Sequence, residues 1–138
     1  MCITIPADLG RLAEVRRFVA EKASHYCGDE AYLYELTLIV EEAITNIILH
    51  GYQSEHGEIT IWVQALQDST DVIIRDQAPP YDPTCLPPAQ LDIPLGRRNL
   101  GGLGVHLMRI NSDRMSYRRT PEGSNELILG KKYPVGVG

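Results

Sequence analysis

The most regular hydrophobic pattern in the chain runs from Leu36 to Tyr52. Its apolar positions recur every three or four residues, at Leu36, Val40, Ala43, Ile44 and Ile47. This spacing places the apolar side chains on one face of an amphipathic helix. The pattern predicts a helix from about Glu30 to His50, which ends at Gly51 because glycine commonly follows the last helical turn.

Two polar residues of this helix border its apolar face. Glu42 and Asn46 are four residues apart, so their side chains share one stripe of the helix. A carboxylate and a carboxamide at the border of a core are costly unless they bind something. Asn46 offers an oxygen that could bind Mg²⁺, and Glu42 could act as a general base. The alternatives are an ordinary solvent-facing asparagine and a surface glutamate.

The same reading of the pattern predicts the other elements. Alternating apolar and polar positions indicate strands, and a three-to-four-residue period indicates helices. Strands are expected at 2–5, 58–66, 71–75, 112–119 and 125–133, and further helices at 9–19 and 103–110. Asp8 is a plausible N-cap for the first helix. The strands at 58–66 and 71–75 are expected to pair as an antiparallel hairpin.

The order of these elements predicts the fold class. It reads strand, two helices, two strands, loop, helix, two strands. This order favours an α+β two-layer sandwich with a mixed, mainly antiparallel sheet and its helices on one face. The chain has 138 residues, no internal repeat and no composition change, so residues 1–138 are expected to form one domain.

A long irregular stretch interrupts the order after Asp76. The segment DQAPPYDP at 76–83 contains three prolines, which forbid regular structure, and the residues at 84–99 show no clear pattern. Loops of such length are usually lids or binding loops, or disordered. Asp76 itself either forms the turn or accepts a hydrogen bond from an amino group of a ligand.

A glycine-rich stretch follows this loop. Gly101, Gly102 and Gly104 lead into the expected helix at 103–110. Glycines allow backbone N–H groups to approach an anion, and a helix N-terminus favours negative charge. The stretch is neither a P-loop nor a dinucleotide fingerprint, because it lacks the required lysine and final glycine. A purely structural role for the glycines remains open.

Composition and charge exclude several classes of function. The formal net charge of −5 argues against non-specific nucleic-acid binding. The N-terminal residues lack the features of a signal peptide, and no apolar run approaches the length of a membrane span. Three scattered cysteines (Cys2, Cys27 and Cys85) suggest reduced thiols in a cytoplasm.

Two groups of charged or metal-binding side chains carry weaker signals. Four basic residues give the first helix a basic outer surface: Arg11, Arg16, Arg17 and Lys22. This surface is either a solvated helix face or a docking surface for an acidic partner. The four histidines do not form a ligand cluster in the sequence, so a metal site built from them is not expected.

Three segments together resemble a known family. EEAITN with HGY, then DQAPPYDP, then GGLGVHLMRINSDRMSYRRTPEGSNELIL, in this order and spacing, are similar to the motifs of GHKL ATPases, which have the Bergerat fold. More narrowly, the chain resembles the stand-alone anti-sigma-factor serine/threonine kinases of bacteria. The resemblance covers nearly the whole chain.

The resemblance implies a role for each motif. Glu42 matches the general base, Asn46 the residue that holds Mg²⁺, and Asp76 the aspartate that contacts the adenine amino group of ATP. The segment at 84–99 matches the ATP lid. The remaining residues expected at the nucleotide are Ala78, where the family commonly has glycine, and Arg98, Gly101, Gly102, Leu103, Gly104 and Val105.

The resemblance also implies a function. Such proteins phosphorylate a serine or threonine on an anti-sigma factor antagonist, sequester a sigma factor and are usually homodimers. The alternative is a partner-clamping or nucleotide-binding module of the same fold with little catalysis. The ATPase half of a sensor histidine kinase is disfavoured, because no helix pair with a phospho-accepting histidine precedes the motifs.

Overall fold

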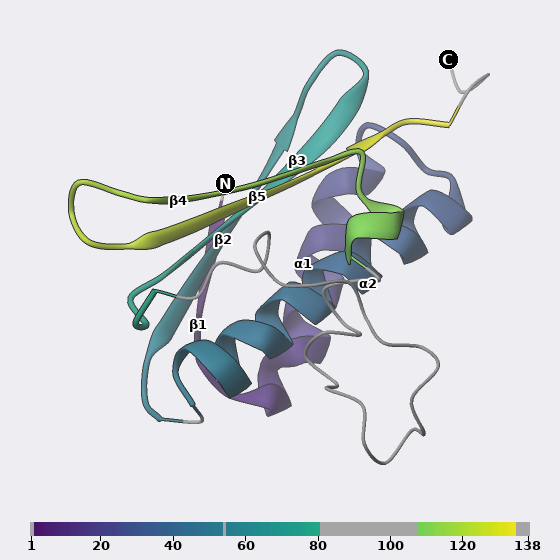
Figure 1. Ribbon diagram of the computed structural model, residues 1–138. Helices are drawn as coiled ribbons and strands as arrows, with labels where there is room; N and C mark the ends of the chain where they lie inside the picture. Colours follow the sequence, from purple (N-terminus) through teal and green to yellow (C-terminus); the bar gives the residue numbers. More distant parts are fainter. Residues whose placement is uncertain (1, 54, 81–107, 135–138) are drawn as a thin grey trace, which may run out of the picture.

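A five-stranded sheet forms one layer of the protein (Figure 1). The computed structural model describes residues 2–53, 55–80 and 108–134. The strand order is β1-β2-β3-β5-β4, and every described pairing is antiparallel. The strands are β1 Cys2–Pro6, β2 Glu58–Ala65, β3 Ser69–Asp76, β4 Arg114–Arg119 and β5 Asn125–Lys132. The expected hairpin of β2 and β3 is confirmed, and the described sheet is antiparallel throughout rather than mixed.

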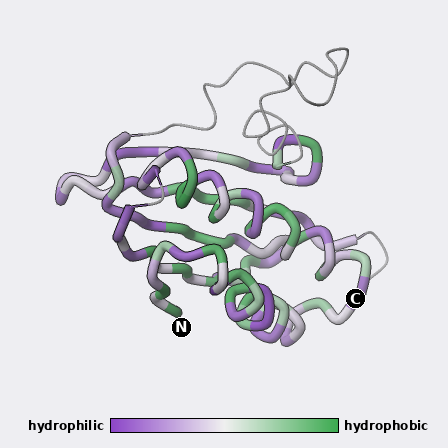
Figure 2. The backbone as a smooth tube through the Cα atoms, turned by 90° about the horizontal axis from the view of Figure 1, so that it is seen from below, coloured by the Kyte–Doolittle hydropathy of each residue, from purple (hydrophilic) through white to green (hydrophobic). Residues whose placement is uncertain are grey.

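The second layer consists of helices that cover one face of the sheet (Figure 1). Helix α1 spans Leu12–Ser24 and helix α2 spans Glu30–Asn46, and residues 108–111 are also helical. Hydrophobic and hydrophilic positions alternate along both long helices (Figure 2). Their apolar sides pack on the sheet through fully buried residues such as Leu36, Ile44 and Ile74. The predicted α+β two-layer sandwich is confirmed.

The long helix ends differently from the prediction. Regular α-helix stops at Asn46, and a π-helical turn, η2, continues over Ile47–Gly51. The backbone N–H of Tyr52 donates to the carbonyl of Ile47, five residues earlier. This wider turn begins directly after Asn46. Turns of this kind occur frequently at functional sites.

The first helix begins later than predicted. The Asp8 carboxylate caps a short 3₁₀ turn, η1 Leu9–Arg11, by accepting from the backbone N–H of Gly10 at 3.0 Å. Helix α1 starts only at Leu12. On its outer surface, Arg16 pairs with Glu41 of α2 at 2.5 Å, so part of the basic surface ties the two helices together.

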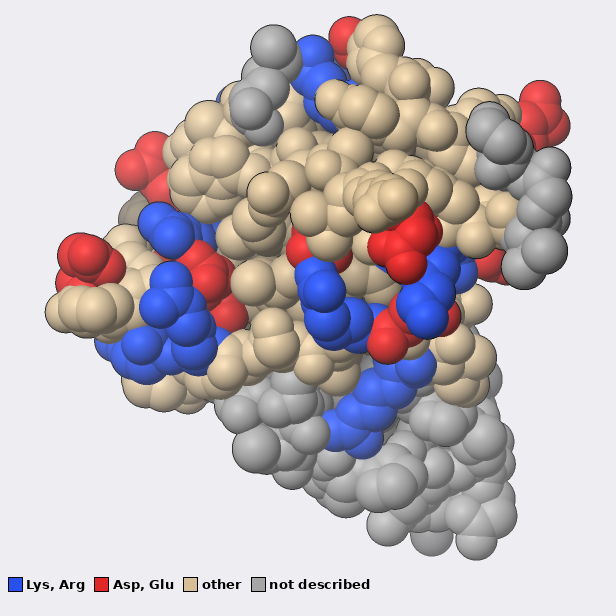
Figure 3. All heavy atoms as spheres, turned by 90° about the horizontal axis from the view of Figure 1, so that it is seen from above, with Lys and Arg blue, Asp and Glu red and all other residues tan. Residues whose placement is uncertain are grey.

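The face of the sheet away from the helices carries paired charges. Acidic and basic side chains lie next to each other on the side seen in Figure 3. Glu126 is only 5% exposed and accepts hydrogen bonds from Arg75 and Arg118. Asp71 pairs with Arg114 in the same way. Arginines therefore lie over both buried carboxylates on this face, although Oδ1 of Asp71 has no hydrogen-bond partner among the described residues.

Two smaller observations concern membrane-spanning helices and the state of the cysteines. Among the described helices, none has the length and apolar character needed to cross a membrane. Cys2 and Cys27 are both unpaired thiols. Cys85 lies outside the described residues.

Candidate functional site

Helix α2 and the ends of three strands enclose a small hollow. Its walls come from α2, the π-helical turn, β3, β4, β5 and the helical segment 108–111. The lining residues are Ala43, Asn46, Ile47, Asp76, Met108, Tyr117, Asn125 and Leu127. Two of the predicted site residues, Asn46 and Asp76, therefore meet at one place although they are 30 positions apart.

The amide nitrogen of Asn46 lacks a hydrogen-bond partner among the described residues. Asn46 is 5% exposed, and its Nδ2 atom is buried without a partner among the described residues. An unsatisfied buried polar group costs about 1–3 kcal/mol. A bound group that supplies an oxygen next to Asn46 removes this cost. The amide nitrogen of Asn46 is thus suited to donate to a ligand oxygen, whereas a bond from its Oδ1 to Mg²⁺ stays a prediction.

Glu42 lies one helical turn before Asn46 and is half-buried. Burial raises the pKa of the Glu42 carboxyl above its usual value, and the neighbouring charge of Glu41 raises it further. A carboxylate with a raised pKa is a stronger base at neutral pH than an exposed glutamate. The predicted role of Glu42 as a general base remains a prediction that this environment favours.

Asp76 ends β3 and is 5% exposed. Its Oδ1 atom accepts hydrogen bonds from the backbone N–H of Ala78 at 2.9 Å and from Nδ2 of Asn125 at 2.8 Å. Burial raises the pKa of the Asp76 carboxyl, whereas these two donors and the nearby Arg119 lower it. The turn-forming role of Asp76 is therefore confirmed by the bond from Ala78. Asp76 also lines the hollow, and its contact with an amino group of a ligand stays a prediction.

The methyl group of Ala78 does not line the hollow. Ala78 is 1% exposed, and a Cβ atom built on Gly51 would lie 3.2 Å from the Ala78 Cβ. The methyl group thus packs against the end of the π-helical turn. The backbone carbonyl of Ala78 accepts from Asn125 at 2.9 Å and from Arg119 at 3.1 Å. A contact between Ala78 and a nucleotide stays a prediction.

Tyr52 anchors the loop that follows Asp76. Its hydroxyl accepts from the backbone N–H of Gln77 at 2.7 Å and donates to the carbonyl of Glu58 at 2.7 Å. The ring passes so close to Gly57 that an added Cβ would lie 2.2 Å from it. Tyr52 is 8% exposed and belongs to the hydrophobic core.

The other predicted nucleotide contacts lie outside the described residues. They are Arg98, Gly101, Gly102, Leu103, Gly104 and Val105, together with the segment expected to be the ATP lid. Of the predicted helix at 103–110, only 108–110 fall within the described part, and they are helical. Met108, the first of these, is completely buried in the wall of the hollow.

The free volume of the hollow is about 20 Å³. This is space for about one water molecule. The donor and acceptor groups of Asn46 and Asp76 fit an adenine nucleotide, but an adenine ring requires the hollow to widen.

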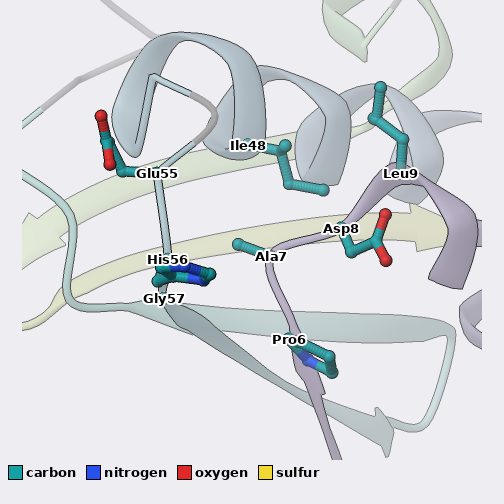
Figure 4. A pocket seen from close by; sticks show the side chains of 8 residues that line it. All are labelled: Pro6, Ala7, Asp8, Leu9, Ile48, Glu55, His56 and Gly57. Atoms are coloured by element: carbon teal, nitrogen blue, oxygen red, sulfur yellow. The ribbon is translucent and has the colours of Figure 1, made fainter.

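A larger cavity of about 440 Å³ lies on the other side of the π-helical turn (Figure 4). Asp8, Glu55 and His56 are its ionisable residues. Figure 4 shows the two carboxylates pointing in different directions, neither of them toward the imidazole ring. No cluster of three metal-binding side chains occurs among the described residues.

Some members of the site were not found from the sequence. Tyr117 and Arg119 of β4 both donate to Oδ1 of Asn125, at 2.5 Å and 2.9 Å. Nε2 of Gln77 donates to the hydroxyl of Ser124 at 2.5 Å. The alternation of β4 places Tyr117 and Arg119 on the same face of the sheet as the helices. That alternation was the one feature of the sequence that could have indicated a place for Tyr117 and Arg119 beside the site.

The comparisons with known proteins now define the class. The histidine kinase-like ATPase domain family matches residues 5–131, and the chain belongs to this family. It is 30% identical to the serine-protein kinase RsbW of Bacillus velezensis and 28% identical to that of Bacillus subtilis. Each alignment covers 96% of this chain and 84% of the relative. It is also 32% identical to the serine/threonine-protein kinase BtrW of Bordetella bronchiseptica, over 70% of this chain and 68% of that protein.

Proposed function

We propose that the protein is an ATP-dependent serine/threonine kinase that acts as an anti-sigma factor. It phosphorylates an anti-sigma factor antagonist, sequesters a sigma factor and forms a homodimer. The observation that carries the proposal is the meeting of Asp76 with Asn46, whose buried amide nitrogen lacks a partner among the described residues. The family membership and the names of the relatives support the kinase class.

In this proposal ATP with Mg²⁺ supplies the phosphoryl group, and the protein supplies positioning and a base. Asp76 accepts a hydrogen bond from the amino group of adenine. Asn46 holds the metal through its amide oxygen, a hard ligand of the kind that Mg²⁺ prefers. Glu42 removes the proton from the hydroxyl group of the acceptor serine or threonine. The environment that raises its pKa favours this step.

The small hollow supports a second candidate function. A free volume of about 20 Å³ is far below that of a nucleotide base. A module of the same fold that clamps its partners and has little catalysis would need no larger space. A single phosphotransfer experiment distinguishes this clamp from the kinase.

The test is to mix the protein with radiolabelled ATP, Mg²⁺ and its cognate antagonist. The kinase proposal predicts label on a serine or threonine of the antagonist, transferred far more slowly by the Glu42→Gln variant. An unlabelled antagonist that still forms a stable complex with the protein would support the clamp instead. Titration with ATP and ADP, with and without Mg²⁺, measures separately whether the nucleotide binds.

A further inference from the structure

Three side chains at the ends of adjacent strands form one row across the sheet. Asp76 on β3 is the register partner of Asn125 on β5, and Asn125 is the register partner of Arg119 on β4. All three lie on the sheet face that carries the helices, since side chains alternate between faces along a strand. The amide of Asn125 therefore lies between a carboxylate and a guanidinium group.

The neighbours of Asn125 fix the orientation of its amide. Oδ1 accepts from the hydroxyl of Tyr117 at 2.5 Å and from Nη1 of Arg119 at 2.9 Å. Arginine can only donate, so the oxygen must face it. Nδ2 donates to Oδ1 of Asp76 at 2.8 Å and to the carbonyl of Ala78 at 2.9 Å. Rotating the amide by 180° would place donors against donors and acceptors against acceptors.

These contacts use the whole hydrogen-bonding capacity of Asn125. Both hydrogens of Nδ2 and both lone pairs of Oδ1 are engaged, and the residue is 4% exposed. Asn125 thus acts through Asp76 rather than on a ligand. Oδ1 of Asp76 already accepts two hydrogen bonds, whereas Oδ2 receives none from the described residues. Asp76 therefore presents one acceptor, Oδ2, to whatever enters the hollow.

We propose that Asn125, held by Tyr117 and Arg119, is a positioning residue that orients Asp76 so that the site selects adenine over guanine nucleotides. This inference rests on the proposed function, because it assigns the base specificity of the same site. A fixed Oδ2 acceptor matches the exocyclic amino group of adenine, which donates. Guanine carries a carbonyl oxygen at the equivalent position, and two acceptors facing each other repel.

The sequence of charges along the row of Asp76, Asn125 and Arg119 supports the positioning role of Asn125. The oxygen of the Asn125 amide faces the positive guanidinium of Arg119, and its N–H groups face the carboxylate of Asp76. The amide dipole is therefore aligned favourably with both charges. Hydrogen bonds to charged groups are the stronger kind, so the row resists rotation of the Asp76 carboxylate.

The experiment measures the dissociation constants of ATP and GTP for the full-length protein and its Asn125→Leu variant. Leucine has a similar size but donates no hydrogen bond to Asp76. We expect the affinity for ATP to fall about tenfold, the order expected for losing one hydrogen bond to a charged group. The affinity for GTP should change little, so the ratio of the two dissociation constants, GTP over ATP, should fall by about the same tenfold factor. Asn125→Gln, which retains an amide, should restore part of the ratio.

A second pair of variants tests the inference without a substitution at a buried residue. Arg119 is exposed, so Arg119→Met is expected to fold, which circular dichroism checks. It should lower the ATP-to-GTP preference in the same direction. The matched control is Arg118→Met, at the adjacent position of β4. Arg118 lies on the opposite face and donates to Glu126, so its removal should leave the preference unchanged.

Two results would overturn the inference, and they are distinguishable. In the first result, Arg119→Met loses affinity for ATP and GTP equally, or Asn125→Leu does so while folded. The row of Asp76, Asn125 and Arg119 is then merely structural. The proposed function still stands in that case, because the unchanged protein binds nucleotide. If the unchanged protein binds neither nucleotide, both the base specificity and the proposed function are wrong.

Discussion

The hydroxyl of Tyr52 lies 2.7 Å from the backbone nitrogen of Gln77, and this contact holds the turn that begins at Asp76. Tyr52→Phe removes the acceptor for this N–H and the donor to the carbonyl of Glu58. Leaving such groups unsatisfied costs about 1–3 kcal/mol. We expect the free energy of unfolding to drop by this amount, measured by urea denaturation. The proposed affinity for ATP should also fall, because the turn positions Asp76.

Tyr34→Phe is the matched control for this prediction. Tyr34 is 68% exposed on the surface of α2, so the variant should have nearly the stability of the unchanged protein. Equal stability of all three proteins would show that the Tyr52 hydroxyl does not hold the turn.

Glu42→Gln should separate catalysis from binding. Glutamine has nearly the shape of glutamate but cannot accept a proton at neutral pH. We expect the rate of phosphotransfer to drop by about 10²–10⁴-fold, the usual contribution of a general base, with unchanged affinity for ATP. Transfer of label to the antagonist and a nucleotide titration measure the two quantities.

Glu41→Gln provides the control for the preceding variant. Glu41 is the adjacent residue of the same helix, and its carboxylate pairs with Arg16 of α1. This variant should retain most of the phosphotransfer rate. If Glu42→Gln instead abolished nucleotide binding, Glu42 would be a structural residue of the site.

The features that the sequence predicted well are those that depend on local periodicity. The apolar spacing from Leu36 to Ile47 and the alternation in β2 and β3 are local patterns, and the structure confirms the helix and the hairpin that they predicted. The placement of Asn46 at the border of the buried face followed from the same periodicity. The π-helical turn after Asn46 was missed, because glycine at position 51 signals only where a helix stops.

The row of Asp76, Asn125 and Arg119 could not be predicted in the same way. Asp76 and Asn125 are 49 positions apart and become neighbours only because β5 pairs with β3. A strand shifted by one residue would point Asn125 to the opposite face. The register that brings the three side chains together depends on the whole sheet, and no local pattern specifies it.

Acid should destabilise the protein through Glu126. The guanidinium of Arg118 lowers the pKa of the Glu126 carboxyl below its ordinary value of 4.5, and Arg75 adds to this effect. Because the pKa is lower in the folded state, the carboxylate contributes stability above pH 4.5. This contribution is lost as the pH falls through the folded-state pKa. Glu126→Gln should therefore show a weaker loss of stability on acidification.

Urea denaturation at a series of pH values, from about pH 6 downward, follows this transition. Glu122→Gln serves as the control, because Glu122 is an exposed acid in the turn between β4 and β5. Its pH dependence should match that of the unchanged protein. An unaltered acid dependence in Glu126→Gln would show that the arginine pairs contribute nothing to the stability.

Alkali should destabilise the protein through Tyr32. This residue is 2% exposed, and its hydroxyl donates to the backbone carbonyl of Lys131 at 2.7 Å. Burial raises the pKa of the Tyr32 hydroxyl from 10.0 to about 12. The neutral form therefore contributes stability that is complete below pH 10.0 and is lost as the pH rises through about 12.

The near-ultraviolet absorbance of tyrosinate follows this ionisation directly. The chain contains seven tyrosines. The step at about pH 12 is expected from Tyr32, and burial also raises the pKa of a second tyrosine, Tyr52. Tyr32→Phe should remove this late step and lower the free energy of unfolding at neutral pH by about 0.5–1.5 kcal/mol, because one buried hydrogen bond is lost. A late step that persists in Tyr32→Phe would assign it to another tyrosine. The contact between α2 and β5 would then not depend on a protonated Tyr32.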